Sequence, residues 1–337
     1  MSLDKSMILA IETSCDETSI AILKDGKELL ANIVSSQIDT HKEYGGVIPE
    51  VASRLHVENI NICLDEALSK ANVTYKDITL IVVTKGPGLI GALHVGLQAA
   101  KAISIAHDIP IIGLNHMAGH IYSNRYVSEL KFPLLCLIVS GGHTELVLMK
   151  EEYDFEIIGE TLDDAVGEAY DKVARVLGLA YPGGPIIDRL AKEGQPIYDV
   201  PYPKVEGDYN FSFSGIKTAI LNLVTKLNNR KETFKNEDIA ASFQDQVINI
   251  LVDKVLLALE KHQVKQVLLA GGVSANSKLR EVIKREVNKK HPDIEVIIPP
   301  LWCCTDNAAM MAMAGFYSKN EPENLDFGVD PNLVLGE

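Results

Sequence analysis

The sequence predicts an α/β fold built from two similar halves, each with the order β-β-β-α-β-α. Short apolar runs alternate with longer segments of helical periodicity along the chain, which is typical of α/β proteins. Each half opens with two strands joined by a turn of glycine or hydroxyl residues, at 7–23 and again at 134–149. At 337 residues the chain also exceeds the usual size of one hydrophobic core. We therefore expect two lobes, each presenting its first turn to the phosphates of a nucleotide.

The predicted elements of the first half, in order, are strands at 7–11, 20–23 and 29–35, a helix at 49–69, a strand at 78–84, a helix at 90–106 and a strand at 109–114. The strands are apolar runs bounded by polar or glycine-rich segments, and the helix at 49–69 has an apolar face. Lys85-Gly86-Pro87-Gly88 has the shape of a phosphate-binding loop but lacks the Gly-Lys-Ser/Thr ending of a P-loop. We interpret it as a tight turn that needs the conformational freedom of glycine.

The second half repeats this plan with strands at 134–139, 144–149 and 155–159, helices at 165–177, 215–227 and 239–261, a strand at 266–270, a helix at 277–287, a strand at 295–298 and a helix at 308–317. Residues 179–213 are rich in Gly, Pro, Tyr and Asp, and we expect an ordered surface excursion there. Gly271-Gly272 would let the backbone approach an adenosine closely. After residue 317 the chain becomes polar and resembles a tail. The alternative to the duplicated plan is a generic α/β protein whose glycine-rich turns have no ligand.

Composition indicates a globular protein, because hydrophobic residues make up 47% of the chain and the mean hydropathy is +0.08. No apolar run approaches the ~20 residues that span a bilayer, and the N-terminus lacks the pattern of a signal peptide. The five cysteines are odd in number, scattered, and mostly inside apolar runs. We therefore expect a cytoplasmic protein with reduced thiols and no membrane association.

The formal net charge is −14, and no basic stripe is visible in the sequence. A protein that binds nucleic acid by itself usually has a basic face. A polyanionic substrate would therefore need a local positive patch, a metal ion or a partner protein that supplies positive charge.

The segment His116-Met117-Ala118-Gly119-His120 follows an apolar run and is expected to begin a helix. Its two histidines are four residues apart, so they would lie on one helical face and could bind one divalent metal ion. The segment lacks the glutamate that serves as general base in the zinc-protease motif. Two helical histidines that share a face by chance are the alternative explanation.

The turn after the first strand, Glu12 to Ser19, is rich in small hydroxyl residues and contains Asp16. Backbone amides and hydroxyls in such a turn can hold phosphate oxygens, and Asp16 could hold a metal ion or position a nucleophile. An ordinary polar β-turn explains the composition equally well, so both interpretations stay open at this point.

Ten segments that span nearly the whole chain, in order, closely resemble the TsaD family of tRNA threonylcarbamoyladenosine transferases, formerly labelled O-sialoglycoprotein endopeptidases. They are Ile11–Thr18, Gly45–Arg54, Gly86–Leu93, Asn115–His120, Val139–Val147, Gly167–Arg175, Tyr181–Pro185, Phe211–Ala219, Gly271–Arg280 and Thr305–Met310. The length and the Phe-Ser-Phe-Ser-Gly-Ile-Lys-Thr run are similar to the bacterial branch of the family.

The resemblance implies an actin/Hsp70-like (ASKHA) fold in which the two halves flank a central nucleotide and metal cleft. We expect one lobe at residues 1–115 plus about 307–337 and the other at 116–306, with the metal site at their boundary. The metal would be held by His116, His120 and Asp306. Two imidazoles and a carboxylate leave open coordination positions, as expected of a catalytic metal. The family implies iron or zinc, and we expect Fe²⁺ in preference to zinc.

The implied reaction moves a threonylcarbamoyl group from threonylcarbamoyl-adenylate to the N6 amine of adenosine 37, in tRNAs that read codons starting with A. AMP leaves. The resemblance assigns substrate binding to the following residues: Ile138, Val139, Ser140, Gly141 and Gly142 for the phosphate and acyl group, Asp171 and Gly184 for the ribose, Asn276 on the adenine side, and Asp188 as a further substrate-binding residue. Asp16 is the candidate for proton removal or for ordering water.

The resemblance also implies two partner proteins: TsaB, a relative without the metal site, and TsaE, a small P-loop ATPase. We expect TsaB to contact the N-terminal half. Three rival functions are a metalloprotease, a small-molecule kinase of the same superfold that uses ATP, and a non-catalytic nucleotide-binding scaffold. The protease would need a general base between the histidines, where residues 117–119 offer none. The kinase would not need a paired-histidine metal site, and the scaffold would bind ATP without metal-dependent turnover.

Overall fold

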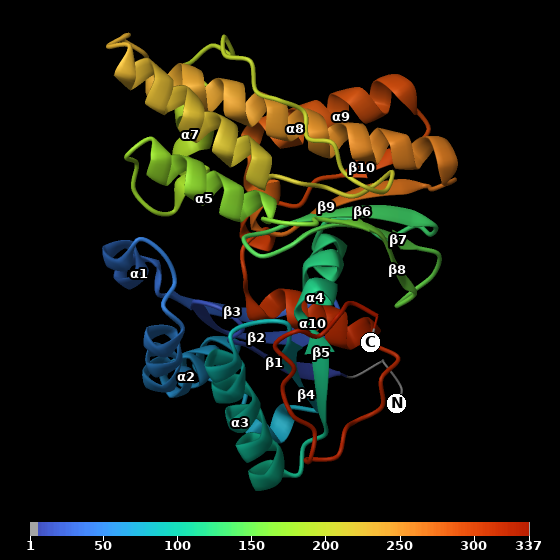
Figure 1. Ribbon diagram of the computed structural model, residues 1–337. Coiled ribbons are helices and arrows are strands. Elements are labelled where there is room, and N and C mark those ends of the chain that lie inside the picture. Colours follow the sequence, from blue (N-terminus) through green and yellow to red (C-terminus); the bar gives the residue numbers. More distant parts are fainter. Residues whose placement is uncertain (1–5, 337) are drawn as a thin grey trace. The chain divides into compact units, whose positions relative to one another are not determined.

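The computed structural model describes residues 6–336, which divide into two compact units (Figure 1). Unit 1 contains the chain up to Glu129 and again from Leu301 onward, whereas unit 2 is the continuous segment Leu130–Pro300. The boundaries expected from the sequence, at 115 and 307, assign residues 116–129 and 301–306 to the other lobe. The structure places both segments in unit 1, because helix α4 (His116–Tyr122) packs against helix α10 (Ala308–Tyr317).

Unit 1 is built on a five-stranded sheet with the order β3-β2-β1-β4-β5. Its strands are β1 (Met7–Glu12), β2 (Glu17–Lys24), β3 (Glu28–Ser36), β4 (Leu80–Gly86) and β5 (Ile111–Asn115). The first three strands are antiparallel neighbours, and β4 and β5 add to the sheet parallel to β1. Almost every residue of β1 and β2 is buried, because helices cover both faces of the sheet.

Helices α2 (Pro49–Ala71) and α3 (Ile90–His107) cover one face of this sheet, and α10 packs on β1, β2 and β4 (Figure 1). Leu9, Ile11 and Ile81 pack with α2 and α3 in one core. Val82 follows Ile81 in β4, so its side chain points to the opposite face of the sheet. There it contacts Gly315 of α10 so closely that a Cβ on Gly315 would overlap the Val82 side chain. A short helix α1 (Ile38–Tyr44) and single turns at 75–77, 123–126 and 301–303 complete the unit.

Residues 318–335 are named here the C-terminal segment. This segment packs against β5 and its neighbours, whereas the sequence predicted a tail. The Glu323 amide donates to the Ile111 carbonyl (2.8 Å), and the Glu323 carboxylate accepts from the Gly113 amide (2.9 Å). Lys101 on α3 donates to the Phe327 carbonyl and lies 4.8 Å from the centre of its ring. The segment therefore pairs with an edge strand whose backbone groups would otherwise face solvent.

Unit 2 repeats the sheet of unit 1 with the order β8-β7-β6-β9-β10. Its strands are β6 (Leu134–Val139), β7 (Thr144–Met149), β8 (Phe155–Glu160), β9 (Gln266–Ala270) and β10 (Glu295–Ile297). Here too the first three strands are antiparallel, and the last two join parallel to the first. The expected duplication of the β-β-β-α-β-α plan is confirmed.

The helices of unit 2 are α5 (Val166–Val176), α6 (Gly183–Ala191), α7 (Ser214–Asn229), α8 (Asn236–Lys261) and α9 (Ser277–Lys290). Figure 1 shows α5, α7 and α8 on one side of the sheet, and their apolar residues share a core with Leu135, Leu137 and Leu146. Helix α6 lies inside the stretch expected to be a surface excursion. None of the described helices is long and apolar enough to cross a membrane.

Candidate metal centre

His116 and His120 occupy the first and fifth positions of α4, which follows β5 without an intervening loop. The Asn115 side chain starts the helix, because its Oδ1 accepts a hydrogen bond from the Met117 amide (2.8 Å). The ring centres of the two histidines are 4.7 Å apart. The i,i+4 spacing therefore places both imidazoles on one face, as the sequence predicts.

Asp306 joins this pair from the other end of the chain. It lies directly before Asn307, whose Oδ1 accepts from the Met310 amide at the start of α10. Its Oδ1 is 3.4 Å from Nε2 of His116 and 3.1 Å from Nε2 of His120. One ligand atom from each of the three residues lies within 4.8 Å of the others. The packing of α4 against α10 brings these distant residues together.

The state of His120 shows that these residues fit a metal ion. Its side chain is completely buried, and neither ring nitrogen has a hydrogen-bond partner among the described residues. Nε2 is close to Asp306 but lacks the geometry of a hydrogen bond. A buried polar atom without a partner costs free energy, and a cation bound by the three residues would provide that partner. Two imidazoles and a carboxylate are a donor set that suits zinc or ferrous iron.

Glu12 is a further functional residue that the sequence reasoning did not single out. It ends β1, is fully buried, and its Oε2 lies 3.1 Å from Nδ1 of His116. The Ser14 amide (2.6 Å) and the Thr84 hydroxyl donate to the same carboxylate. A carboxylate on Nδ1 holds the proton there and leaves Nε2 as the atom that can bind a metal. The one sign of its role in the sequence is that an acidic residue ends an apolar run that forms a buried strand.

The charges around His116 favour a cation at this place. Burial alone would raise the pKa of Glu12 and of Asp306, but His116 lowers the pKa of both carboxyl groups below their ordinary values. Burial alone would lower the pKa of His116, but Glu12 and Asp306 raise it well above its usual range. Two ionised carboxylates thus stabilise positive charge on the imidazole, and the same field would stabilise a bound metal ion.

Asp16 lies in the turn between β1 and β2, but it does not belong to the cluster of His116, His120 and Asp306. Its carboxyl group interacts with the neighbouring Cys15 and Glu17. Burial, followed by the charges of Asp306 and Asp16, raises the pKa of Glu17 well above its ordinary value. The acidic turn and the metal ligands therefore influence each other electrostatically.

The first group of expected substrate residues forms the hairpin turn between β6 and β7. Ile138 and Val139 are buried in β6, and Ser140 closes the turn, with its amide donating to the His143 carbonyl (2.9 Å). Gly141 and Gly142 are exposed, and a Cβ on either residue would meet no atom within 4 Å. The tip of this turn therefore has open space on the side where a side chain would stand.

The remaining expected substrate residues lie on helices of unit 2. Asp171 accepts a hydrogen bond from the Gly183 amide (2.7 Å), which fixes the start of α6 beside Gly184. Asp188 accepts from the hydroxyl of Ser277 (2.9 Å) and from the amide of Gln244 (3.2 Å). The structure thus brings Asp171 together with Gly184, and it places Asp188 in a separate network.

Asn276 belongs to this second network. Its Nδ2 donates to Oε1 of Gln244 (2.7 Å) and to the Tyr170 hydroxyl (3.3 Å), while its Oδ1 accepts from the Leu279 amide (2.9 Å) and caps α9. Gln244 therefore links Asn276 to Asp188. Neither Gln244 nor Tyr170 was identified from the sequence. Gln244 lies inside a helix without a recognisable motif, and Tyr170 lies in the Gly167–Arg175 segment but was given no role there.

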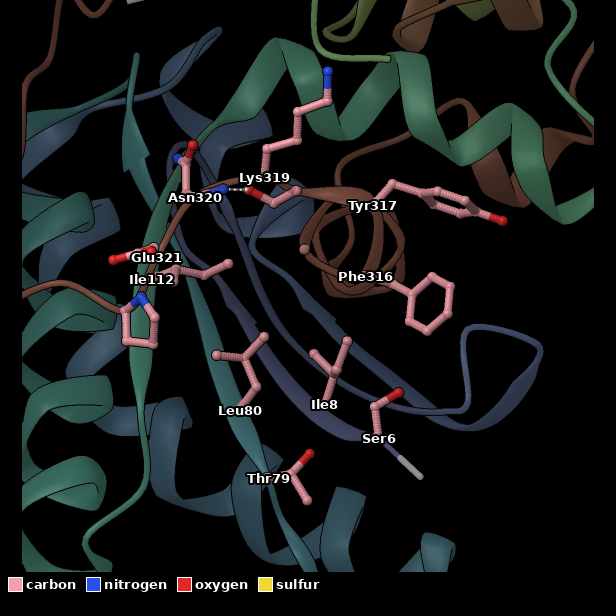
Figure 2. Close-up of a pocket in the computed structure, with 13 residues that line it drawn as sticks. Ser6, Ile8, Thr79, Leu80, Ile112, Phe316, Tyr317, Lys319, Asn320 and Glu321 are labelled. Atoms are coloured by element: carbon pink, nitrogen blue, oxygen red, sulfur yellow. Dashed lines mark hydrogen bonds between the residues drawn. The ribbon is translucent and has the colours of Figure 1, made fainter. Parts of the chain in front are cut away.

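Unit 1 also contains a pocket of about 740 Å³ that is separate from the metal centre. Figure 2 shows Ile8 and Leu80 from the sheet together with Phe316 and Tyr317 at the end of α10. Ile8 and Leu80 lie at the amino ends of β1 and β4, whereas Glu12 and His116 lie at or after the carboxyl ends of their strands. Catalytic groups of α/β sheets gather at the carboxyl ends, so this pocket is not part of the candidate centre.

Each unit contains the same mixed sheet, and unit 1 adds a His-His-Asp cluster after its parallel strands. Together these features define an actin/Hsp70-like protein with a candidate metal centre. The fold is similar to component A of (R)-2-hydroxyglutaryl-CoA dehydratase from Acidaminococcus fermentans (TM-score 0.53, 15% identity), with 93% of this chain and 97% of that chain covered. It is also similar to HypF (TM-score 0.60, 15% identity), with 93% of this chain and 46% of that chain covered.

The chain belongs to the TsaD family, tRNA N6-adenosine threonylcarbamoyltransferase, whose family model matches residues 28–313. A relative with that name from Bacillus cereus is 57% identical over 333 residues, which cover 98% of this chain and 97% of that protein. Another, from Geobacillus kaustophilus, is 54% identical over 331 residues, which cover 97% and 96% of the two chains.

Proposed function

We propose that this protein transfers the threonylcarbamoyl group of threonylcarbamoyl-adenylate to the N6 amine of adenosine 37, in tRNAs that read codons starting with A, and releases AMP. The His116, His120 and Asp306 cluster, in a chain of this transferase family, carries the proposal. The N6 amine is a weak nucleophile because its lone pair is delocalised into the ring. The site must therefore activate the acyl carbon and stabilise the charge on the departing phosphate.

We infer that His116, His120 and Asp306 hold one divalent metal ion, with ferrous iron favoured over zinc. Two histidines and one carboxylate with open positions are typical of non-haem Fe(II) sites. When bound, the ion would supply Lewis-acid polarisation of the acyl carbonyl or of the leaving phosphate. Glu12 holds Nδ1 of His116 and thereby keeps Nε2 directed toward Asp306.

The groups that bind the substrate would come mainly from unit 2. The backbone amides of Gly141 and Gly142 would donate hydrogen bonds to phosphate or acyl oxygens, and Ile138, Val139 and Ser140 would hold the turn. Asp171 and Gly184 would bind the ribose, Asn276 would bind on the adenine side, and Asp188 would be a further substrate-binding residue. Asp16, in the corresponding turn of unit 1, would remove the amine proton or order a water molecule.

We further propose that the protein works in the cytoplasm with tRNA and with the two partners TsaB and TsaE. The net charge of −14 supports a need for partners, because the long-range field of the lone chain repels a polyanion. The reduced, mostly buried cysteines agree with a reducing compartment.

The test combines metal analysis with a transfer assay that supplies threonylcarbamoyl-adenylate, tRNA and both partners. His116→Ala and His120→Ala should abolish metal binding. Asp306→Asn should reduce transfer by more than the roughly 10- to 100-fold that loss of an outer-shell partner costs, because a neutral amide replaces an anionic ligand. Glu260→Gln, which removes an exposed carboxylate on α8 of unit 2, is the control and should behave like the wild type.

Full transfer by Asp306→Asn, or stoichiometric metal in either alanine variant, would overturn the ligand assignment. Phosphorylation of a small acceptor in place of acyl transfer would favour the kinase alternative. Cleavage of a protein substrate would favour the protease alternative.

A further inference from the structure

We propose that the C-terminal segment is a positioning element of the metal centre, which holds α4 in the orientation that metal binding requires. The inference rests on the proposed metal-binding role of His116, His120 and Asp306. The residues that it concerns, in the C-terminal segment and at Gly86 and Asn115, are not among the proposed metal ligands. Two independent chains of contacts connect the segment to His116.

The first chain of contacts runs through Asn115. Its Oδ1 caps α4, and its Nδ2 donates a hydrogen bond to the Leu333 carbonyl (3.2 Å). Asn115 is only 8% exposed, so water does not readily replace either partner. One amide side chain therefore joins the C-terminal segment to the first turn of the helix that carries both histidines.

The second chain of contacts runs through the loop after β4 and through Ser14 to the imidazole ring of His116. The Lys85 carbonyl accepts from the Asp330 amide (2.9 Å), and the Gly88 amide donates to the Pro331 carbonyl (3.2 Å). The next residue of that loop, Leu89, donates to the Ser14 carbonyl (2.8 Å). Ser14 in turn places its hydroxyl 3.1 Å from Nδ1 of His116.

Gly86 shows how closely the C-terminal segment fits this loop. A Cβ on Gly86 would overlap the Asp330 carbonyl oxygen and touch the Leu333 side chain. A side chain at this position would displace the segment without shortening the protein. The close approach thus provides a second, steric way to test the same contact.

The segment is also anchored independently of the centre. The Glu323 carboxylate accepts from the Gly113 amide and lies 3.5 Å from the Lys85 ammonium group. Lys101 holds the Phe327 carbonyl and faces its ring. Helix α4 has only seven residues and contributes two of the three ligands. Metal sites tolerate errors of about 0.5 Å in ligand position, so an external restraint at its first turn matters.

The experiment measures metal affinity in the full-length protein, with Zn²⁺ in competition against a chelator and with the absorption spectrum of bound Co²⁺. Asn115→Ser keeps a good helix cap but removes the donor to Leu333. Gly86→Ala displaces the segment, and truncation after Gly328 removes the contacting residues. We expect each change to weaken Zn²⁺ binding about 3- to 10-fold, as loss of a hydrogen bond would, and to alter the Co²⁺ spectrum.

A double-variant cycle tests whether the effects share one cause. In the chain truncated after Gly328, Asn115→Ser should produce no further loss of affinity, because its partner is already absent. Asn332→Ala changes an exposed side chain of the same segment and should bind Zn²⁺ like the wild type. Thermal unfolding of the metal-free variants separates a positioning effect from general destabilisation.

The outcomes separate the two claims. If the wild type binds no metal, the proposed ligand assignment fails. If the wild type binds metal and Asn115→Ser and Gly86→Ala bind it equally well, the positioning role is wrong. It is equally wrong if affinity falls only in proportion to the unfolding temperature of the metal-free protein.

Discussion

At the scale of single residues, the fold holds the acid Glu145 in an environment that opposes ionisation. Burial, together with the neighbouring carboxylate of Glu160, raises the pKa of Glu145 to about 7. The two residues face each other across β7 and β8. Oε2 of Glu145 is buried and has no hydrogen-bond partner among the described residues. The side chain is therefore costly to ionise in the folded protein.

Stability should consequently depend on pH through this residue. Between its unfolded pKa, near 4.5, and its folded pKa, near 7, the folded protein binds the extra proton, so stability falls as pH rises across this window. Glu145→Gln removes the effect. The variant should match the wild type near pH 4 and exceed it near pH 8 by up to about 3 kcal/mol, at ~1.4 kcal/mol per pKa unit.

Urea denaturation at several pH values measures this difference. Glu193→Gln removes an exposed carboxylate of the same unit; it is the control and should not change the slope. Parallel stability curves for the wild type and Glu145→Gln would contradict the expected shift.

The sequence revealed only some of the residues of the metal centre. The spacing of His116 and His120 is visible locally, because it matches the period of a helix. Asp306 became a candidate only through the family resemblance, since no local pattern connects residues so far apart. Glu12 was missed as a site residue because its contact with His116 depends on how β1 and α4 pack.

At the scale of elements, the first turn of α7 is fixed by a residue from another part of unit 2. Asp163 accepts hydrogen bonds from the hydroxyls of Ser212 (2.5 Å) and Ser214 (2.6 Å) and from the Phe213 amide (2.8 Å). These bonds lower the pKa of Asp163 below its ordinary value, although burial acts in the opposite direction. Ser212 and Ser214, which belong to the Phe211–Ala219 segment, therefore help to fix the start of α7.

We expect Asp163→Ala to lower the free energy of unfolding by about 1 to 2 kcal/mol, similar to the loss of a helix cap. Thermal and urea unfolding would measure the effect. Asp199→Ala, which removes an exposed carboxylate of the same unit, should change stability by less than about 0.5 kcal/mol. Equal stability of the two variants would show that the Asp163 bonds contribute nothing net.

Most elements could be predicted because their periodicity is strong. The strand at 266–270 and the helix at 308–317 match the structure at both ends. Helix α6 was missed, because Gly183-Gly184-Pro185 is a poor start for a helix in isolation. Its stability comes from tertiary contacts, namely the Asp171 carboxylate at its first amide and the burial of Ile187. The C-terminal segment was missed for the same reason, since its order comes from contacts with β5 and α3.

At the scale of the whole molecule, the net charge of −14 opposes the binding of RNA. We expect the lone chain to bind tRNA weakly and to be nearly inactive, because its long-range field repels a polyanion. Addition of TsaB and TsaE should restore both binding and transfer. Both activities should be measured with and without the partners, at two salt concentrations. Robust multiple-turnover transfer by the lone chain would refute this dependence.

Because unit 1 combines the chain up to Glu129 with the segment from Leu301 onward, its completion must wait until all of unit 2 has been translated. The ribosome makes β1 to β5 and the histidine helix first, and then all of unit 2. At about 5 to 20 residues per second, roughly 10 to 40 s separate His120 from Asp306. During that interval the nascent sheet lacks α10 on one face and lacks Asp306, the third residue of the candidate metal centre. Unit 2, as one continuous segment, can fold in the meantime, so loading of the metal would be among the last steps of the protein's maturation.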